Sequence, residues 1–176
     1  MKNMTKMSLI LFLVCGIAAG SLAFVNKATK DRIAEFARIE KAEALKEVFP
    51  GVEEFKEILP GRQWEALRAG QRQGYVFSAL VQGYSGPVEA LFGLDLRNAI
   101  TGVRVIRHNE TPGLGAKITG EKFLGQFQGR AREAVALKKD DPAGAIDAIA
   151  AATISSRAVT HSIRSVIDSF LKGELK

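Results

Sequence analysis

Cysteine, histidine, tryptophan and tyrosine are scarce in this sequence. Its 176 residues contain one cysteine, one tryptophan, two histidines and two tyrosines. A lone cysteine excludes a disulfide within the chain. His108 has no second metal ligand nearby at a typical spacing, so we expect a solvated or hydrogen-bonded histidine and no metal. The sequence also lacks a nucleophile elbow, H-E-x-x-H, C-x-x-C, a P-loop and a G-x-G-x-x-G that opens a helix. We therefore expect no substrate turnover by this chain alone.

Positive charge is in mild excess but is nowhere concentrated. The formal net charge is +6 and the pI is about 9.6, yet the basic residues are scattered among acidic ones. The sequence has no basic stripe with interleaved aromatic residues, which argues against a nucleic-acid partner. A composition of 47% hydrophobic and 25% charged residues is typical of a globular chain with one core.

One long apolar run lies near the N-terminus. Residues Met7 to Val25 carry no charge, and the run is close to the roughly 20 residues that cross a bilayer as a helix. It is longer than the core of a signal peptide, which favours a retained membrane anchor over residues 1–25. The alternative is cleavage at one of two small-x-small sites, Ala18-Ala19-Gly20 or Ser21-Leu22-Ala23. Lys2 and Lys6 favour a cytoplasmic N-terminus, and basic residues just after the run weaken that signal.

After the apolar run the residue pattern changes twice. Residues 26–50, rich in alanine, glutamate and lysine, predict a juxtamembrane helix that ends at Pro50-Gly51 and is either a spacer or a docking surface for partner subunits. Residues 51–176 predict a separate domain, in which short apolar runs alternate with turn residues. We expect strands over Trp64 to Ala69, Tyr75 to Gln82, Val88 to Leu94, Ile100 to His108 and Ala134 to Lys138, with helices over Glu121 to Phe127 and from Ser155 to Leu171. The fold class is α+β: an antiparallel, partly barrel-like sheet packed with helices, after an N-terminal transmembrane helix.

Alternation within two of the strands predicts how the sheet packs. One face is expected to carry Tyr75, Phe77, Ala79 and Val81, and another Val88, Ala90, Phe92 and Leu94. These rows supply the apolar half of a sheet that packs on helices.

The final helix and the loop before it are the most informative stretch. Apolar residues recur at three- and four-residue spacing from Ala158 to Phe170, which predicts one buried face. Ala150 to Ala152 leave room for the close approach of a ligand, and Thr153 brings a hydroxyl to the helix start. Because a helix start has unpaired N–H groups and the positive end of the helix dipole, it suits a phosphate. The alternative is that Ser155 or Ser156 is an ordinary N-cap.

Three motifs in this half of the chain resemble those of known proteins. Asp147 and the run Ala150 to Ser156 resemble D-x-x-S-G-A-T-x-[ST]-S of the FMN-binding domain family, in which the threonine hydroxyl is joined to the phosphate of FMN. His108 to Gly115 resembles the H-x-E-T-P-G-L-G loop of RnfG, the G subunit of the Rnf electron-transport complex. Gly83 to Pro87 resembles the G-Y-x-G-x turn that precedes this loop there. With their flanking residues, the three motifs follow the family order over residues 75–170.

The chain departs from the family pattern at residues 150 and 151, where two alanines stand in place of serine and glycine. If the glycine has a positive φ, Ala151 is strained there, and loss of the serine hydroxyl would impair recognition by a modifying enzyme. The acceptor Thr153 and the upstream Asp147 are both present.

The resemblance implies an electron-carrier subunit of a membrane Rnf-type complex, with FMN joined to Thr153 by a phosphoester and Asp147 recognised by a flavin transferase. It implies that FMN contacts Tyr84, Glu110, Thr111, Leu114, Gly115, Ala151, Ala152, Ile154 and Ser155. The implied partners are the other membrane and redox subunits, the transferase and membrane lipid. The implied location is the inner membrane, crossed once, with the soluble domain on the extracytoplasmic side. The alternatives are the C subunit of a sodium-translocating NADH:quinone reductase, and a membrane-anchored assembly or binding protein that has lost its flavin.

Overall fold

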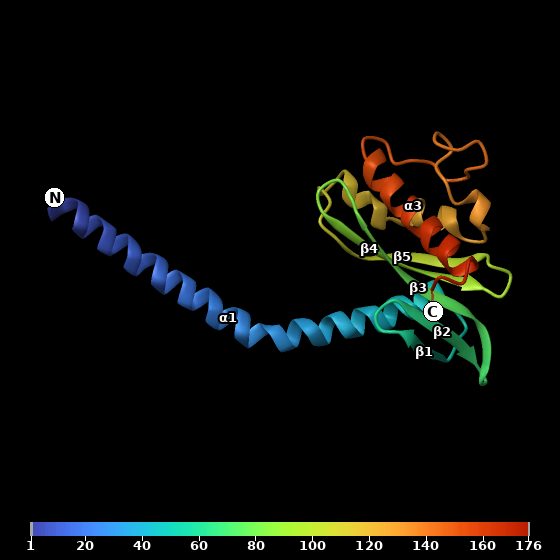
Figure 1. Cartoon of the computed structure of the whole chain (residues 1–176), viewed down its shortest axis with the longest axis horizontal. Coiled ribbons are helices and arrows are strands. Elements are labelled where there is room, and N and C mark those ends of the chain that lie inside the picture. Colours follow the sequence, from blue (N-terminus) through green and yellow to red (C-terminus); the bar gives the residue numbers. More distant parts are fainter. Residues whose placement is uncertain (1, 176) are drawn as a thin grey trace. The chain divides into compact units, whose positions relative to one another are not determined.

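The computed structural model describes residues 2–175, with side chains from Met4 to Leu175. One long helix, α1 (Lys2–Val48), precedes a sheet and a final helix, α3 (Thr153–Leu171) (Figure 1). The strands are β1 (Glu54–Leu59), β2 (Gln63–Arg68), β3 (Gln71–Gln82), β4 (Pro87–Asp95) and β5 (Ile100–His108). Between the sheet and α3 lie the short helices η1 (Gly115–Thr119), α2 (Glu121–Leu124), η2 (Gly125–Phe127) and η3 (Arg132–Ala134).

Helix α1 is continuous, with no break between the apolar run and the charged segment that follows. By length and composition it includes a stretch able to cross a membrane, and protein covers none of that stretch. A signal sequence near an N-terminus has the same features. The helix ends at Val48, just before Pro50-Gly51, as the sequence predicts, and Gly51 has a φ of +83°.

The five strands form an antiparallel meander in the order β1-β2-β3-β4-β5, and β2 to β5 lie where the sequence predicts strands. Strand β1 is not predicted, because its sequence EFKEIL is mostly exposed at the sheet edge and shows no apolar alternation. The predicted strand over Ala134 to Lys138 is wrong. Within residues 2–175, the pairing there is limited to one parallel bridge between Leu137 and Ile146. This segment is apolar because Val135 and Leu137 are buried in the core, and not because it joins the sheet.

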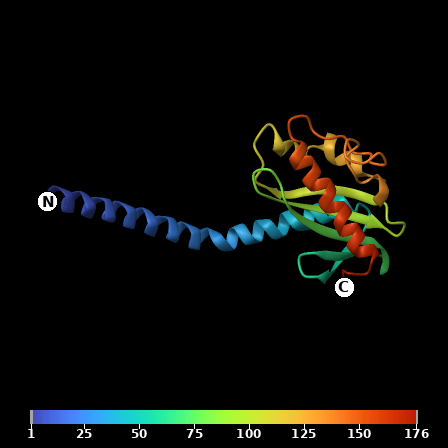
Figure 2. The same cartoon turned by 45° about the horizontal axis from the view of Figure 1, so that its top comes forward.

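The apolar rows of β3 and β4 lie on the same face of the sheet, which corrects the expectation of separate faces. Phe77 pairs with Phe92, and residues directly opposite each other in an antiparallel pair project to the same side. Helix α3 covers this face with Val159, Ile163 and Ile167, all fully buried in the same core. Figure 2 shows α3 lying across the sheet.

The opposite face of the sheet packs against the last turns of α1. Leu45, Val48 and Phe49 form a second core with Trp64 of β2 and with residues of β3 and β4. Contacts divide the chain after Glu40, and one compact unit begins at Lys41. The end of α1 is therefore part of the folded domain, and both faces of the sheet are covered.

Candidate functional site

Helix α3 begins at Thr153, slightly earlier than the sequence suggests. Its N-cap residue is Ala152, whose side chain makes no capping bond, so the alternative that Ser155 or Ser156 caps the helix is wrong. The Ser156 hydroxyl instead accepts a hydrogen bond from the Ile149 N–H at 3.0 Å and donates one to the Ala152 carbonyl at 2.9 Å. These two bonds fix the loop immediately before Thr153.

The start of α3 presents unpaired donors. Its first amide with a backbone partner is that of Ser156, which donates to the Ala152 carbonyl at 3.0 Å, so the N–H groups of Thr153, Ile154 and Ser155 have no backbone acceptor in the described chain. The Thr153 side chain is half-buried, and its hydroxyl makes no hydrogen bond to any residue from 2 to 175. A hydroxyl and three N–H groups are thus available to a ligand at one place.

Ala151 adopts a conformation that favours glycine. Its φ is +62°, in the left-handed region, where a Cβ approaches the neighbouring carbonyl too closely. The expectation of strain at this residue is therefore confirmed. Because Ala151 is exposed, the strain comes from its own backbone and not from crowding by neighbours.

Glu110 is the buried polar centre of the site, with only 4% of its surface exposed. Its Oε1 atom accepts hydrogen bonds from the N–H groups of Tyr84 at 2.7 Å and Ser85 at 3.4 Å. Its Oε2 atom accepts one from the Ser155 hydroxyl at 2.9 Å. The Glu110 N–H donates to Nδ1 of His108 at 3.2 Å, so the expectation of a hydrogen-bonded histidine is confirmed. One carboxylate thus joins three segments that are far apart in the sequence.

These segments enclose a cavity of about 390 Å³. It is lined by Thr153 and by all the residues that the resemblance implies as FMN contacts: Tyr84, Glu110, Thr111, Leu114, Gly115, Ala151, Ala152, Ile154 and Ser155. The volume falls within the roughly 300–1,000 Å³ typical of small-molecule sites. At the rim, Tyr84 is 69% exposed, Ile154 53% and Leu114 46%. The cavity therefore offers apolar walls to a ligand that reaches Thr153.

Asp147 lies outside this cavity. With Lys117, Gln126 and Ala150 it borders a neighbouring cavity of about 950 Å³. Its carboxylate accepts a hydrogen bond from Lys138 Nζ at 2.7 Å, and its side chain is 66% exposed. Asp147 is thus accessible from outside the domain but does not line the cavity at Thr153.

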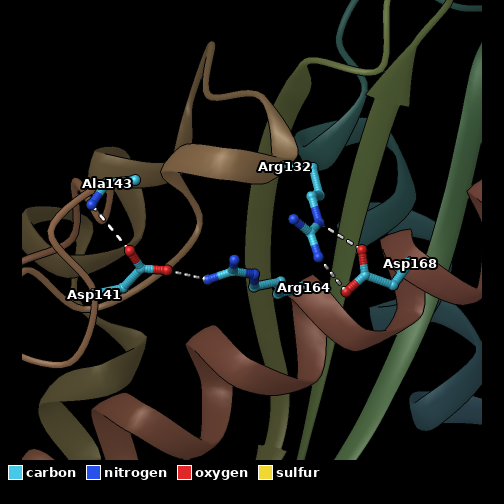
Figure 3. A network of polar contacts seen from close by, with 5 residues as sticks. All are labelled: Arg132, Asp141, Ala143, Arg164 and Asp168. Carbon is cyan, nitrogen blue, oxygen red and sulfur yellow. Dashed lines mark hydrogen bonds and ion pairs between the residues drawn. The ribbon is translucent and has the colours of Figure 1, made fainter.

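Ion pairs fasten the segment before the site to α3 (Figure 3). Arg132 donates two hydrogen bonds to Asp168, at 2.5 and 2.9 Å. Arg164 donates one to Asp141 at 2.9 Å, and the other oxygen of Asp141 accepts the Ala143 N–H at 2.9 Å. The hydrogen bonds from arginine stabilise the ionised carboxylates, which lowers the pKa of Asp141 and of Asp168 below the ordinary aspartate value. The loop that leads to Thr153 therefore begins at a residue, Asp141, that is itself bonded to α3.

Comparison with known proteins identifies the family. A family model described as an FMN-binding domain matches residues 83–168, and one described as the RnfG N-terminal region matches residues 1–48. Over 179 residues the chain is 31% identical to the G subunit of the ion-translocating oxidoreductase complex of Methanosarcina acetivorans, with 95% of this chain and 94% of the relative covered. The chain belongs to the RnfG family. It is also 33% identical over 193 residues to the G subunit of the Na(+)-translocating ferredoxin:NAD(+) oxidoreductase complex of Acetobacterium woodii, with 96% and 92% covered.

This RnfG-family chain shares its fold with two solved structures. It matches the C subunit of the Na(+)-translocating NADH-quinone reductase from Parabacteroides distasonis with a TM-score of 0.54 and 24% identity, over 65% of this chain and 62% of the other. It matches NqrC of Shewanella oneidensis with a TM-score of 0.50 and 18% identity, over 73% of each chain. These matches confirm the predicted α+β fold.

The residues of the site fit FMN, as expected of an RnfG-family chain with an FMN-binding domain. A phosphate is suited to the unpaired N–H groups at the start of α3. A flat aromatic ring system is suited to the exposed apolar groups of Tyr84, Leu114 and Ile154. The prediction of FMN as the cofactor thus agrees with both the family and the geometry.

Proposed function

We propose that this RnfG-family chain carries electrons within an Rnf-type ion-translocating oxidoreductase complex, through FMN joined to the Thr153 hydroxyl by a phosphoester. The observation that supports this most strongly is the position of that hydroxyl. It belongs to the first residue of α3, it lines the cavity, and it makes no hydrogen bond to any described residue. FMN supplies the redox chemistry when bound. The domain therefore needs no catalytic side chain, which agrees with the lack of catalytic motifs.

The start of α3 suits the phosphate of such a linkage. A phosphate joined through two ester bonds keeps one negative charge, and the N–H groups of Thr153, Ile154 and Ser155 are free to donate to it. The dipole of a helix of 19 residues adds a favourable interaction of about 0.3–1 kcal/mol with an anion at this end.

The other walls of the cavity would orient the isoalloxazine ring. Tyr84, Leu114 and Ile154 supply apolar surface at the rim. The hydroxyls of Ser85 and Thr111 lie 3.2 Å apart and bond the turn to the loop beside them. Together these contacts would hold the ring at one edge of the domain, where a partner protein can exchange electrons with it.

Maturation and assembly require partners. We propose that a flavin transferase recognises the exposed Asp147 and joins FMN to Thr153 from a flavin dinucleotide donor. The Thr153 oxygen forms the new ester bond at the flavin-side phosphorus, the phosphoanhydride bond breaks, and the nucleoside monophosphate leaves as the hydroxyl proton is lost, so the chain gains the mass of FMN less one water. We further propose that α1 lies as a single pass in the lipid of the inner membrane, with the soluble domain on the extracytoplasmic side. Other membrane and redox subunits of the complex would then be its neighbours. The names of the relatives, which are complex subunits, support this assignment.

Intact-mass analysis of the full chain, co-expressed with a flavin transferase, tests the proposal. The wild type should gain the mass of FMN less one water, and T153A should gain nothing. T29A is the matched control, because Thr29 is exposed and lines neither the cavity at Thr153 nor the one that Asp147 borders, and it should gain the same mass as the wild type. A flavin adduct on T153A, or an unmodified wild type, contradicts the proposal, and the second result favours a scaffold that has lost its flavin.

A second candidate function is that of the C subunit of a sodium-translocating NADH:quinone reductase. The fold shared with the Parabacteroides distasonis protein fits it, whereas the relatives that cover nearly the whole chain are G subunits of ion-translocating oxidoreductase complexes. Purification in mild detergent from the native membrane separates the two. Co-purification with Rnf-type subunits supports the first function, and co-purification with quinone-reductase subunits supports the second.

A further inference from the structure

A buried carboxylate without a cation lies at the centre of the site. Within the described residues, Glu110 forms no ion pair, and its partners are two backbone N–H groups and one hydroxyl. Burial of a carboxylate that lacks a counter-charge is unfavourable. The oxygen of a glutamine could accept the two N–H bonds, and its NH₂ could donate to the hydroxyl. Hydrogen bonding alone therefore does not explain why residue 110 is charged.

The surroundings of Glu110 leave room for both of its oxygens. A Cβ added at Gly83 would lie 2.1 Å from Oε1, and one added at Gly115 would lie 2.5 Å from Oε2. Any side chain at either position would collide with the carboxylate. Two glycines thus allow the backbone to close around Glu110. The groups that donate hydrogen bonds to its carboxylate come from the turn after β3 and from the first turn of α3.

We propose that Glu110 is a positioning residue, which ties the walls of the flavin cavity together and keeps a fixed negative charge beside the flavin. This inference rests on the proposed function. Through Ser155 the carboxylate holds the helical turn that begins with Thr153, and through the N–H of Tyr84 it holds the rim. A negative charge in a poorly hydrated site opposes the uptake of an electron by a neighbouring flavin. The charge of Glu110 therefore lowers the reduction potential of the bound cofactor.

The charge is tested by a redox titration of full-length, flavin-loaded protein. E110Q keeps an acceptor for the Tyr84 N–H and removes the charge, so E110Q protein that carries flavin should have a more positive midpoint potential than the flavin-loaded wild type. E121Q is the matched control, because Glu121 is exposed and does not line the cavity, and its potential should equal that of the wild type. An E110Q potential equal to that of the wild type overturns the electrostatic role.

The role of Glu110 in joining the cavity walls is tested without flavin, by amide hydrogen exchange of protein expressed without the transferase. In E110A the Tyr84 amide should exchange at least about tenfold faster than in the wild type, while amides paired within β3 and β4 keep their protection. Equal exchange at Tyr84 overturns the positioning role. If E110A does not fold, the redox titration of E110Q still tests the charge of Glu110. An unloaded wild type refutes the proposed function alone, because the exchange experiment does not depend on flavin.

Discussion

Replacement of Ala151 by glycine should stabilise the protein, whereas glycine at the adjacent Ala150 should destabilise it. Ala151 has a φ of +62°, and a residue with a Cβ in the left-handed region is strained by about 1–2 kcal/mol. Glycine removes this strain, but it also adds about 0.4–1 kcal/mol of conformational entropy to the unfolded chain. The net gain expected for A151G is about 0.5–1 kcal/mol, or about 2–4 °C in the unfolding temperature of a domain of this size.

Ala150 provides the matched control. Both alanines are exposed, so neither substitution removes packing, and Ala150 does not have a positive φ. A150G should therefore lose about 0.4–1 kcal/mol through the unfolded-chain entropy alone. Unfolding is followed by the fluorescence of Trp64, which is the only tryptophan and is 6% exposed in the folded domain. The full chain is used in detergent, without flavin. Equal losses of stability in A151G and A150G would refute the claim that Ala151 is strained.

Three further predictions concern the core, the ion pairs and the loop before Thr153. I163A should lower the free energy of unfolding, measured by urea denaturation, by about 2–5 kcal/mol, because Ile163 is fully buried. A decrease below about 1 kcal/mol would contradict the packing of α3 on the sheet. The lowered pKa values mean that Asp141 and Asp168 stay ionised in the folded state where the unfolded chain binds protons. Their stabilisation is therefore present above the ordinary aspartate pKa of about 3.9 and is lost as the pH falls below it. The unfolding temperature should fall less on acidification in the D141N/D168N double variant than in the wild type, and an equal fall would show that these pairs contribute nothing. D147N should leave the free energy of unfolding within about 0.5 kcal/mol of the wild type, because the ion pair of Asp147 is exposed. It should nevertheless reduce flavin loading, measured by intact mass. Full loading would argue against recognition of Asp147 by the transferase.

The sheet and the last helix could be predicted because their side chains repeat with clear periods. In β3 and β4 every second residue from Tyr75 and from Val88 is apolar, because α3 covers that face of the sheet with a continuous core. The expectation that the apolar rows of β3 and β4 lie on separate faces is wrong, because periodicity within one strand does not give the register between strands. Only the pairing of Phe77 with Phe92 shows that both apolar rows point the same way.

Other features left no usable pattern in the sequence. Strand β1 lies at an exposed edge and has little need for apolar residues. Val135 and Leu137 resemble a strand because they are buried, but their backbone is held by a loop and not by the sheet. The role of Glu110 depends on contacts with Tyr84 and Ser155, which are distant in the sequence. The motifs therefore named the site residues, and only the structure shows what joins them.

The linkage at Thr153 is tested most directly by peptide mass spectrometry of the native protein. Trypsin cleaves after Lys139 and Arg157, so one peptide carries Thr153 together with Ser155 and Ser156. We predict that this peptide is heavier by FMN less one water and that fragmentation places the added mass on Thr153. An unmodified peptide from cells that attach flavin to their other proteins, or an added mass on either serine, would contradict the account.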